Sequence, residues 1–317
     1  MSVDARDLRR QRRRNALQAT ALLAGMISVL ALAAWLLAGA QGLIAVAIAG
    51  AVLIAVRPQV PPAVVLRLYG AVPLPAHAAP DLHRLVAALA ERAGLPSTPR
   101  LHYVPSRLLN AFAVGRPEHA AIAVTDGLLR RLEGRELAGV LAHEISHVRS
   151  DDVWVMSLAD VLTRLSHALA YAGLALLALG LPLLQAQAVD LALVALTLLA
   201  LPTLVTLLQL ALSRSREHDA DLEAARLTGD PVGLARALAI LDREHGRGWE
   251  RILAPQRRGP DPLLLRTHPP TQERIARLRA LAPATRYRVP VRPEGYAPAG
   301  LAPVRRRPRL RATGVRW

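Results

Sequence analysis

The chain has 317 residues, of which 52% are hydrophobic but only 3% aromatic, so alanine, leucine and valine supply most of its apolar surface. It contains no cysteine, which excludes disulfides, thiolate metal ligands and thiol nucleophiles. The net charge is +16, and all 40 basic residues are arginines. Because a P-loop needs a lysine to reach the phosphates, an ATPase of that class is excluded, and we expect no ATP.

An apolar tract at residues 16–56 follows six N-terminal arginines. A membrane-spanning helix needs about 20 apolar residues, so the tract is long enough for two. It predicts spans at Ala16–Ala38 and Leu43–Val56 with a turn at residues 39–42. A cleaved signal peptide is the alternative, but the tract is longer than the core of an ordinary signal.

The region after this hairpin predicts a small unit of helices and short strands. Five prolines between residues 58 and 75 indicate an extended connector. Apolar periodicity then predicts, in order, a helix at 81–94, strands at 100–104, 111–114 and 120–124, and helices at 128–132 and 135–148. The last helix has an apolar stripe with two histidines at its edge.

A second apolar pair follows at residues 165–184 and 189–212, and no arginine lies between Arg164 and Arg214. Both hairpin turns lack arginine, so the positive-inside rule places both termini and the region between the hairpins in the cytoplasm. Buried helices of a soluble domain are the alternative for this pair, because His167 and Asp190 lie within it.

His143 and His147 bracket Glu144 on the predicted helix at 135–148. Residues four apart share a helical face, so both imidazoles can bind one Zn²⁺ with a carboxylate beside them. A chance match is expected in about one chain of this size in a hundred. The alternative is a surface helix with two hydrogen-bonded histidines. A catalytic zinc site also needs a third protein ligand and an open position.

Candidates for the third ligand follow the second hairpin. Glu217 and Asp221 are four residues apart and share a helical face. One can bind metal while the other accepts a hydrogen bond from a ligand imidazole. An exposed acidic helix paired with arginines is the alternative, and the spacing alone does not choose between the two.

The final segment, residues 282–317, is rich in proline and arginine and has no apolar periodicity, so we expect a disordered basic tail. A membrane-tethered nucleic-acid binder would also explain such a tail. However, the chain has one phenylalanine and few other aromatic residues on which bases could stack. We therefore expect no nucleic-acid partner.

The ordered set of motifs resembles the HtpX heat-shock proteases and the related CAAX prenyl endopeptidases, which are membrane-embedded zinc peptidases of the gluzincin type. The resemblance covers roughly residues 15–280. Its matching pieces are Asn110–Gly115, Thr125–Leu129, His143–His147, Glu217–Asp221 and His268–Ile275. Their order, with an apolar hairpin between them, is more specific than any single piece.

The resemblance implies one Zn²⁺ per chain, bound by His143, His147 and Glu217. Glu144 would be the general base, and Asp221 would accept a hydrogen bond from a ligand histidine. His218 departs from the family pattern, which usually has an aromatic residue at that position. We interpret His218 as a filler rather than as a competing ligand.

The resemblance also implies how a substrate is held. His268 would lie near the cleft and stabilise the oxyanion. An edge strand would pair with an extended peptide through Asn110, Ala111, Phe112 and Ala113.

The predicted fold is mainly α with a small β-sheet (α+β), as in a multi-span membrane zincin-type metallopeptidase. Its five expected parts are 1–57 (basic N-terminus and hairpin), 58–156 (cytosolic part with the metal helix), 157–212 (second hairpin), 213–281 (cytosolic part with the third ligand) and 282–317 (tail).

We expect a zinc-dependent endopeptidase of the cytoplasmic membrane, in contact with the lipid bilayer, that cleaves polypeptides, chiefly membrane proteins under quality control. A CAAX-type prenyl endopeptidase is one alternative, although four spans are few for the enclosed chamber of that branch. A non-catalytic membrane scaffold that retains the zincin residues is another, and the intact Glu144 argues against it.

Overall fold

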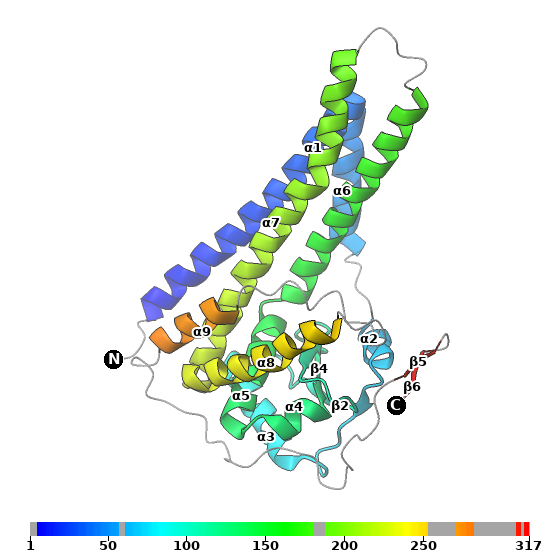
Figure 1. Ribbon diagram of the computed structural model, residues 1–317. Coiled ribbons are helices and arrows are strands. Elements are labelled where there is room, and N and C mark those ends of the chain that lie inside the picture. Colours follow the sequence, from blue (N-terminus) through cyan, green and yellow to red (C-terminus); the bar gives the residue numbers. More distant parts are fainter. Residues whose placement is uncertain are drawn as a thin grey trace. The chain divides into compact units, whose positions relative to one another are not determined.

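The computed structural model describes residues 5–56, 61–180, 188–252, 271–281, 309–311 and 314–316 (Figure 1). His268, most of the basic tail and most of the second predicted turn lie outside the described residues. The chain forms two compact units. The helical unit comprises residues 11–59 and 154–215, and the sheet unit comprises residues 1–10, 60–153 and 216–317.

The helical unit contains α1 (Ala5–Val56), α6 (Asp152–Gly180) and the first part of α7 (Ala188–Thr228). Helix α1 is interrupted at Gly39, whose φ of 57° and ψ of −141° are not helical. A Cβ at Gly42 would lie only 2.1 Å from the carbonyl oxygen of Ala34, so the chain bends sharply between its two arms. The predicted four-residue turn is thus replaced by a break at one glycine, because glycine adopts positive φ without strain.

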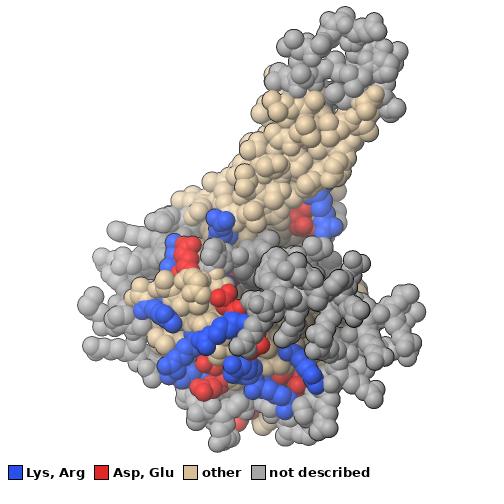
Figure 2. All heavy atoms as spheres, viewed as in Figure 1, with Lys and Arg blue, Asp and Glu red and all other residues tan. Residues whose placement is uncertain are grey.

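Apolar side chains cover the outside of the helical unit as well as its inside. Met26, Leu30 and Leu201 are buried between the helices. Other large apolar side chains are exposed, among them Leu17, Leu32, Ile48, Leu196, Leu199 and Leu207. On the face drawn in Figure 2, most of this unit carries no charged side chain. Soluble domains rarely expose apolar surface on this scale, which favours helices that face lipid over the soluble alternative.

Within the described residues, two helices are long and apolar enough to cross a membrane, namely Leu17–Leu36 and Val194–Thr228. A shorter apolar helix covers Ala38–Val52. The first of these contains most of the first predicted span, and the second contains most of the last predicted span.

The sheet unit is built on four strands, β1 (Val72–Pro73), β2 (Arg100–Val104), β3 (Ala111–Val114) and β4 (Ala121–Thr125). Their order is β1-β2-β4-β3, with β2 and β4 parallel and the two outer pairs antiparallel. The three predicted strands are confirmed to within one residue. Strand β3 lies at an edge, so no other described strand pairs with its outer side.

Helices cover both faces of the sheet. On one face, Ile122 and Val124 of β4 belong to the main core with α3 (Pro80–Ala93), α4 (Asp126–Arg131) and α5 (Gly134–Arg149). On the opposite face, Ala121 and Ala123 belong to a smaller cluster with Leu66 of α2 (Pro62–Leu68). The predicted mainly helical architecture with a small sheet is confirmed.

Helix α5, which carries the two histidines, is held by capping and by close packing. Glu133 and Glu136 form a capping box at its N-terminus, which satisfies backbone N–H groups that lack helical partners. Gly139 allows a close approach of α8 (Pro231–Ile252), because a Cβ at this position would lie 2.9 Å from the Cα of Leu234. Leu141 and Ile145 are completely buried. Packing of the apolar face therefore determines where the histidine face points.

Two predictions about flanking segments need correction. The connector is not wholly extended, because Pro62 starts α2, where its fixed φ and missing N–H suit a first helical turn. In the tail predicted to be disordered, β5 (Arg309–Arg311) and β6 (Gly314–Arg316) pair antiparallel with Leu310 opposite Val315. Arginine and apolar residues alternate there with the two-residue period of a strand, which the composition argument did not consider.

Candidate metal centre

Helix α5 brings His143 and His147 together, as their spacing predicted. The two rings are nearly perpendicular, with centroids 4.6 Å apart. Their Nε2 atoms face each other at 3.1 Å. Because His143 is buried and His147 is half-buried, this helix is not the surface helix with two hydrogen-bonded histidines that was the alternative.

The last part of α7 carries Glu217 and Asp221 to the same place. Oε2 of Glu217 is 3.4 Å from Nε2 of His143, and Oε1 is 3.7 Å from Nε2 of His147. One ligand atom from each of these three residues lies within 4.8 Å of the other two, so the group can hold a metal ion. Glu217 and Asp221 are only 6% and 5% exposed, so the alternative of an exposed acidic helix is also wrong.

A carboxylate faces the second ring nitrogen of each histidine. Nδ1 of His143 is 3.1 Å from Oδ1 of Asp221, the contact predicted for that residue. Nδ1 of His147 is 2.8 Å from Oδ2 of Asp152. Asp152 is a functional residue that the sequence did not predict, although Asp152 follows His147 by only five residues. Asp151 between them has φ of 51°, a left-handed conformation that aspartate tolerates and that separates α5 from α6.

These contacts assign a consistent role to each ring nitrogen. If each Nδ1–H donates to its carboxylate, each Nε2 carries a lone pair. The two Nε2 atoms and the Glu217 carboxylate then place three electron-pair donors in one buried space. Such donors repel one another unless a positive charge lies between them, so the residues fit a bound cation.

The pKa values of the two histidines reflect the same electrostatic environment. Burial lowers the pKa of His143, but its contacts with Asp221 and Glu217 outweigh burial and raise the pKa to about 10. Burial also lowers the pKa of His147, and the hydrogen bond to Asp152 reverses the shift and raises the pKa. The carboxylates therefore make this space favourable for positive charge, whether that charge is a proton or a metal ion.

Arg274 of α9 (Thr271–Ala280) partly balances the two carboxylates. It is 4% exposed. Its Nη1 lies 2.8 Å from Oε2 of Glu217, while Nε and Nη2 donate to Oδ2 and Oδ1 of Asp221 at 2.7 and 2.6 Å. One guanidinium faces two carboxylates, which leaves the cluster with negative charge for a cation. Arg274 lies in one of the motifs that match the family, but its sequence position alone predicts no role for it.

Glu144 lies between the two histidines in sequence and contacts the edge strand. The backbone N–H of Ala113 donates to Oε2 of Glu144 at 3.1 Å. This N–H therefore points away from β4, and in an antiparallel pair the groups of Ala111, two residues earlier, point the same way. The main-chain groups of Asn110 instead bond to Thr125. Within residues 110–113, Ala111 and Ala113 thus direct their main-chain groups to the open edge.

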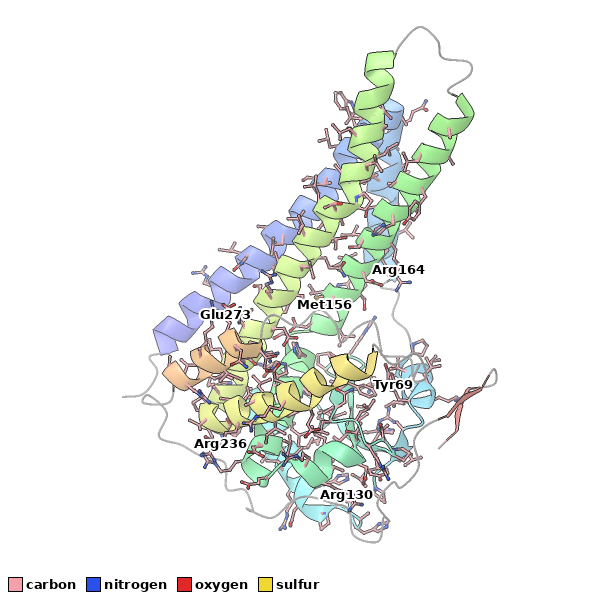
Figure 3. The ribbon with its side chains drawn as sticks, in the orientation of Figure 1. Tyr69, Arg130, Met156, Arg164, Arg236 and Glu273 are labelled. Atoms are coloured by element: carbon pink, nitrogen blue, oxygen red, sulfur yellow. The ribbon has the colours of Figure 1, made fainter. Side chains whose placement is uncertain are left out.

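The remaining predicted residues lie elsewhere. Nε2 of His218 is 3.8 Å from Oε1 of Glu273, which Figure 3 labels on α9, and His218 is not part of the three-residue metal group. This position agrees with the interpretation of His218 as a filler. Phe112 faces α2, where its ring centroid is 4.7 Å from that of Tyr69. His268 lies outside the described residues.

The apolar helices and the buried group of two histidines and a glutamate define the class of a membrane metallopeptidase. The family model for peptidase family M48 matches residues 76–282. The chain belongs to peptidase family M48, and it is a membrane metalloendopeptidase that acts on polypeptides.

Several proteins described as HtpX protease homologues are similar to this chain. The one from Pyrococcus furiosus is 40% identical over 230 residues, covering 69% of this chain and 79% of its own length. The homologue from Acidiphilium cryptum is 41% identical over 235 residues, with the same coverage of 69% and 79%. The predicted resemblance to the HtpX proteases is therefore confirmed.

Among solved structures, the crystal structure of S. mikatae Ste24p aligns with 86% of this chain and 66% of its own, at 21% identity and a TM-score of 0.44. A score this low supports no argument about shared architecture. The family assignment rests on the sequence comparisons.

Asp152→Ala is expected to weaken metal binding by about 10- to 100-fold, because His147 loses the acceptor that orients its ring. Metal retained by the purified protein against increasing chelator would measure the effect. Asp160→Ala is the matched control, since it removes a carboxylate of the same helix that pairs only with Arg164 at 2.7 Å among the described residues. Equal retention by the two variants would contradict the orienting role.

Arg274→Met should destabilise the metal-free protein by about 3 kcal/mol or more, because removing one partner leaves buried carboxylates without their counter-charge. Unfolding in detergent, followed by heat or denaturant, would report the difference. Arg277→Met removes an arginine whose side chain is 59% exposed on the same helix and should change stability little. An Arg274→Met protein as stable as this control would show that Arg274 is not needed to balance the site.

Proposed function

We propose that this metalloendopeptidase binds one Zn²⁺ per chain through His143, His147 and Glu217, and that Glu144 is its general base. The observation that supports this most directly is the convergence of the three ligand atoms within 4.8 Å, in a space where two further carboxylates face the histidines. Two nitrogens and one carboxylate oxygen are a donor set typical of catalytic zinc sites with an open position.

When bound, such an ion polarises the scissile carbonyl and makes a water molecule acidic near neutral pH. The residues of the chain perform the proton transfers. Glu144 takes a proton from the attacking water and returns it to the leaving amine. The Ala113 N–H that donates to Oε2 of Glu144 holds this carboxylate beside the edge strand, where the peptide would lie.

We propose that the substrate pairs with β3 as an added strand. Ala111 and Ala113 direct main-chain groups to the open edge, and these can form the hydrogen bonds of an extended peptide. Phe112 alternates to the other face of the sheet, where its contact with Tyr69 supports the strand from behind. The Ala113 N–H already binds Glu144, so its carbonyl and the main-chain groups of Ala111 remain as the pairing groups. Asn110 would contribute its side chain only.

The wider assignment rests on the arginine distribution and on the family. We propose four spans in the cytoplasmic membrane, with both termini and the metal centre on the cytoplasmic side, because the dense arginine clusters flank the hairpins and their turns contain none. The boundaries at 57, 156, 212 and 281 divide the chain accordingly. His268 would stabilise the oxyanion, and misassembled membrane proteins are the proposed substrates.

Glu144→Gln should reduce peptide hydrolysis by at least about 100-fold while leaving the bound zinc unchanged, because the amide cannot accept the proton and this residue is not a ligand. Casein cleavage and metal analysis of the same preparation measure the two effects. Glu91→Gln, on the exposed side of α3, serves as the control. Cleavage by Glu144→Gln at the wild-type rate would exclude the general-base role.

Glu217→Ala should lose nearly all zinc during purification, since a site with two histidines alone lacks one of its three protein ligands. The wild type should retain about one equivalent, measured by elemental analysis after dialysis. Glu273→Ala is the control, because the side chain of Glu273 on α9 is 50% exposed. This variant should retain zinc like the wild type. If Glu217→Ala holds zinc as tightly as the wild type, Glu217 is not the third ligand.

A further inference from the structure

The face of the sheet unit that carries α2 has an exposed apolar surface next to the end of the first hairpin in sequence. Val64 and Leu68 are four residues apart on α2 and are 46% and 67% exposed. Arg67 of the same helix and Arg100 of β2 are also exposed, and both line one hollow beside α2. We call these four residues the α2 surface. Large apolar side chains next to arginines are typical of segments that lie in a membrane interface.

A hollow of about 330 Å³ lies beside this surface, between α2 and strands β1 and β2, and shares Arg67 and Arg100 with it. Its walls include the apolar residues Leu66, Ala71 and Pro73 and the basic residues Arg67, Arg100 and His102. Within the part of the chain that the structure describes, no aspartate or glutamate lines it. The hollow therefore combines an apolar wall with positive charge, which matches a phosphate group attached to a glycerol and acyl chains.

The arginines of the hollow are available for a ligand. Among the described residues, no carboxylate lies within 4.0 Å of the side chain of Arg67 or Arg100, whereas Arg84, Arg130 and Arg164 of the same chain all have such a partner. Burial, with a smaller contribution from the charge of Arg100, lowers the pKa of His102. A lowered pKa keeps His102 uncharged at neutral pH, so the positive charge of the hollow comes from the two arginines.

The covalent chain keeps α2 near the bilayer. Helix α1 ends at Val56 and α2 begins at Pro62, so only residues 57–61 separate the two helices. Six peptide steps span at most about 22 Å even when fully extended. A surface that starts this close to the apolar second arm of α1 lies within reach of the lipid headgroups, whereas a soluble partner would have to compete with them.

We propose that the α2 surface rests on the membrane and that its hollow binds the phosphate group of an anionic phospholipid through Arg67 and Arg100. Val64 and Leu68 lie at the boundary between headgroups and acyl chains. This contact does not depend on the peptidase chemistry. Its consequence is that the sheet unit is attached to the bilayer by a lipid as well as by the chain.

The absence of cysteine allows a direct test in the full-length protein. Leu68→Cys, labelled with a fluorophore, is placed in nanodiscs that contain phosphatidylcholine with or without phosphatidylglycerol, and quenching by a headgroup nitroxide is measured. Glu91→Cys is the position control, because α3 packs on the opposite face of the sheet from α2. Arg67→Gln with Arg100→Gln tests the arginines. Arg131→Gln with Arg236→Gln, two other exposed arginines, matches the change in charge.

We expect phosphatidylglycerol to increase quenching of the label at position 68. This increase should be at least about twice the increase at position 91. Substitution of Arg67 and Arg100 should abolish that increase, and substitution of Arg131 and Arg236 should leave it intact. Equal quenching at both positions would overturn the proposal. Quenching at position 68 that is the same with and without phosphatidylglycerol would also overturn it. Reversal by inorganic phosphate alone would assign the hollow to a free anion. If quenching at position 68 changes with protein concentration and not with lipid composition, the surface is instead a contact with a second copy of the chain.

Discussion

The Nε2 atoms of His143 and His147 lie 3.1 Å apart, and the Glu217 carboxylate completes the group within the same buried space. Electron-pair donors packed this closely repel one another in a medium that screens charge poorly, so the arrangement is stable only with positive charge among them. Asp221 and Asp152 strengthen this requirement, because each faces the second ring nitrogen of a histidine and favours the tautomer whose Nε2 lone pair points inward. Arg274 supplies part of the balancing charge and leaves the remainder to a cation.

The rest of the sheet unit serves to hold these groups against that repulsion. The apolar side of α5 is enclosed by the main core, and Gly139 allows α8 to pack directly on its backbone. Thr125 bonds to Asn110 at the start of β3, and Ala113 of the same strand bonds to Glu144. The edge strand and the metal helix pack in the same core and are also linked by a hydrogen bond to the Glu144 carboxylate. The carboxylate proposed as general base and the strand proposed to hold the peptide share one hydrogen bond.

The helical unit is organised by a different constraint. Its exposed leucines and its scarcity of charge suit a lipid environment, in which polar groups must find partners inside the protein. Thr163 and Gln209 meet this requirement with a hydrogen bond of 2.6 Å between α6 and α7. Helix α7 contributes residues to both units and carries Glu217 and Asp221 in its final turns. The residue expected to complete the metal site is therefore encoded on the same helix as the last apolar span.

The sequence alone predicted those features that depend on a short repeat of residue types along one helix or strand. A spacing of four residues places His143 with His147 and Glu217 with Asp221, and alternation identifies the strands. It also determined the family, because several short motifs occur in one order. Only the tertiary structure decided that Asp221 faces His143, that Asp152 faces His147 and that Arg274 joins two carboxylates, since these contacts depend on how separate helices pack. Helical periodicity specifies which residues share a face, whereas the packing of α5, α7 and α9 decides which faces meet.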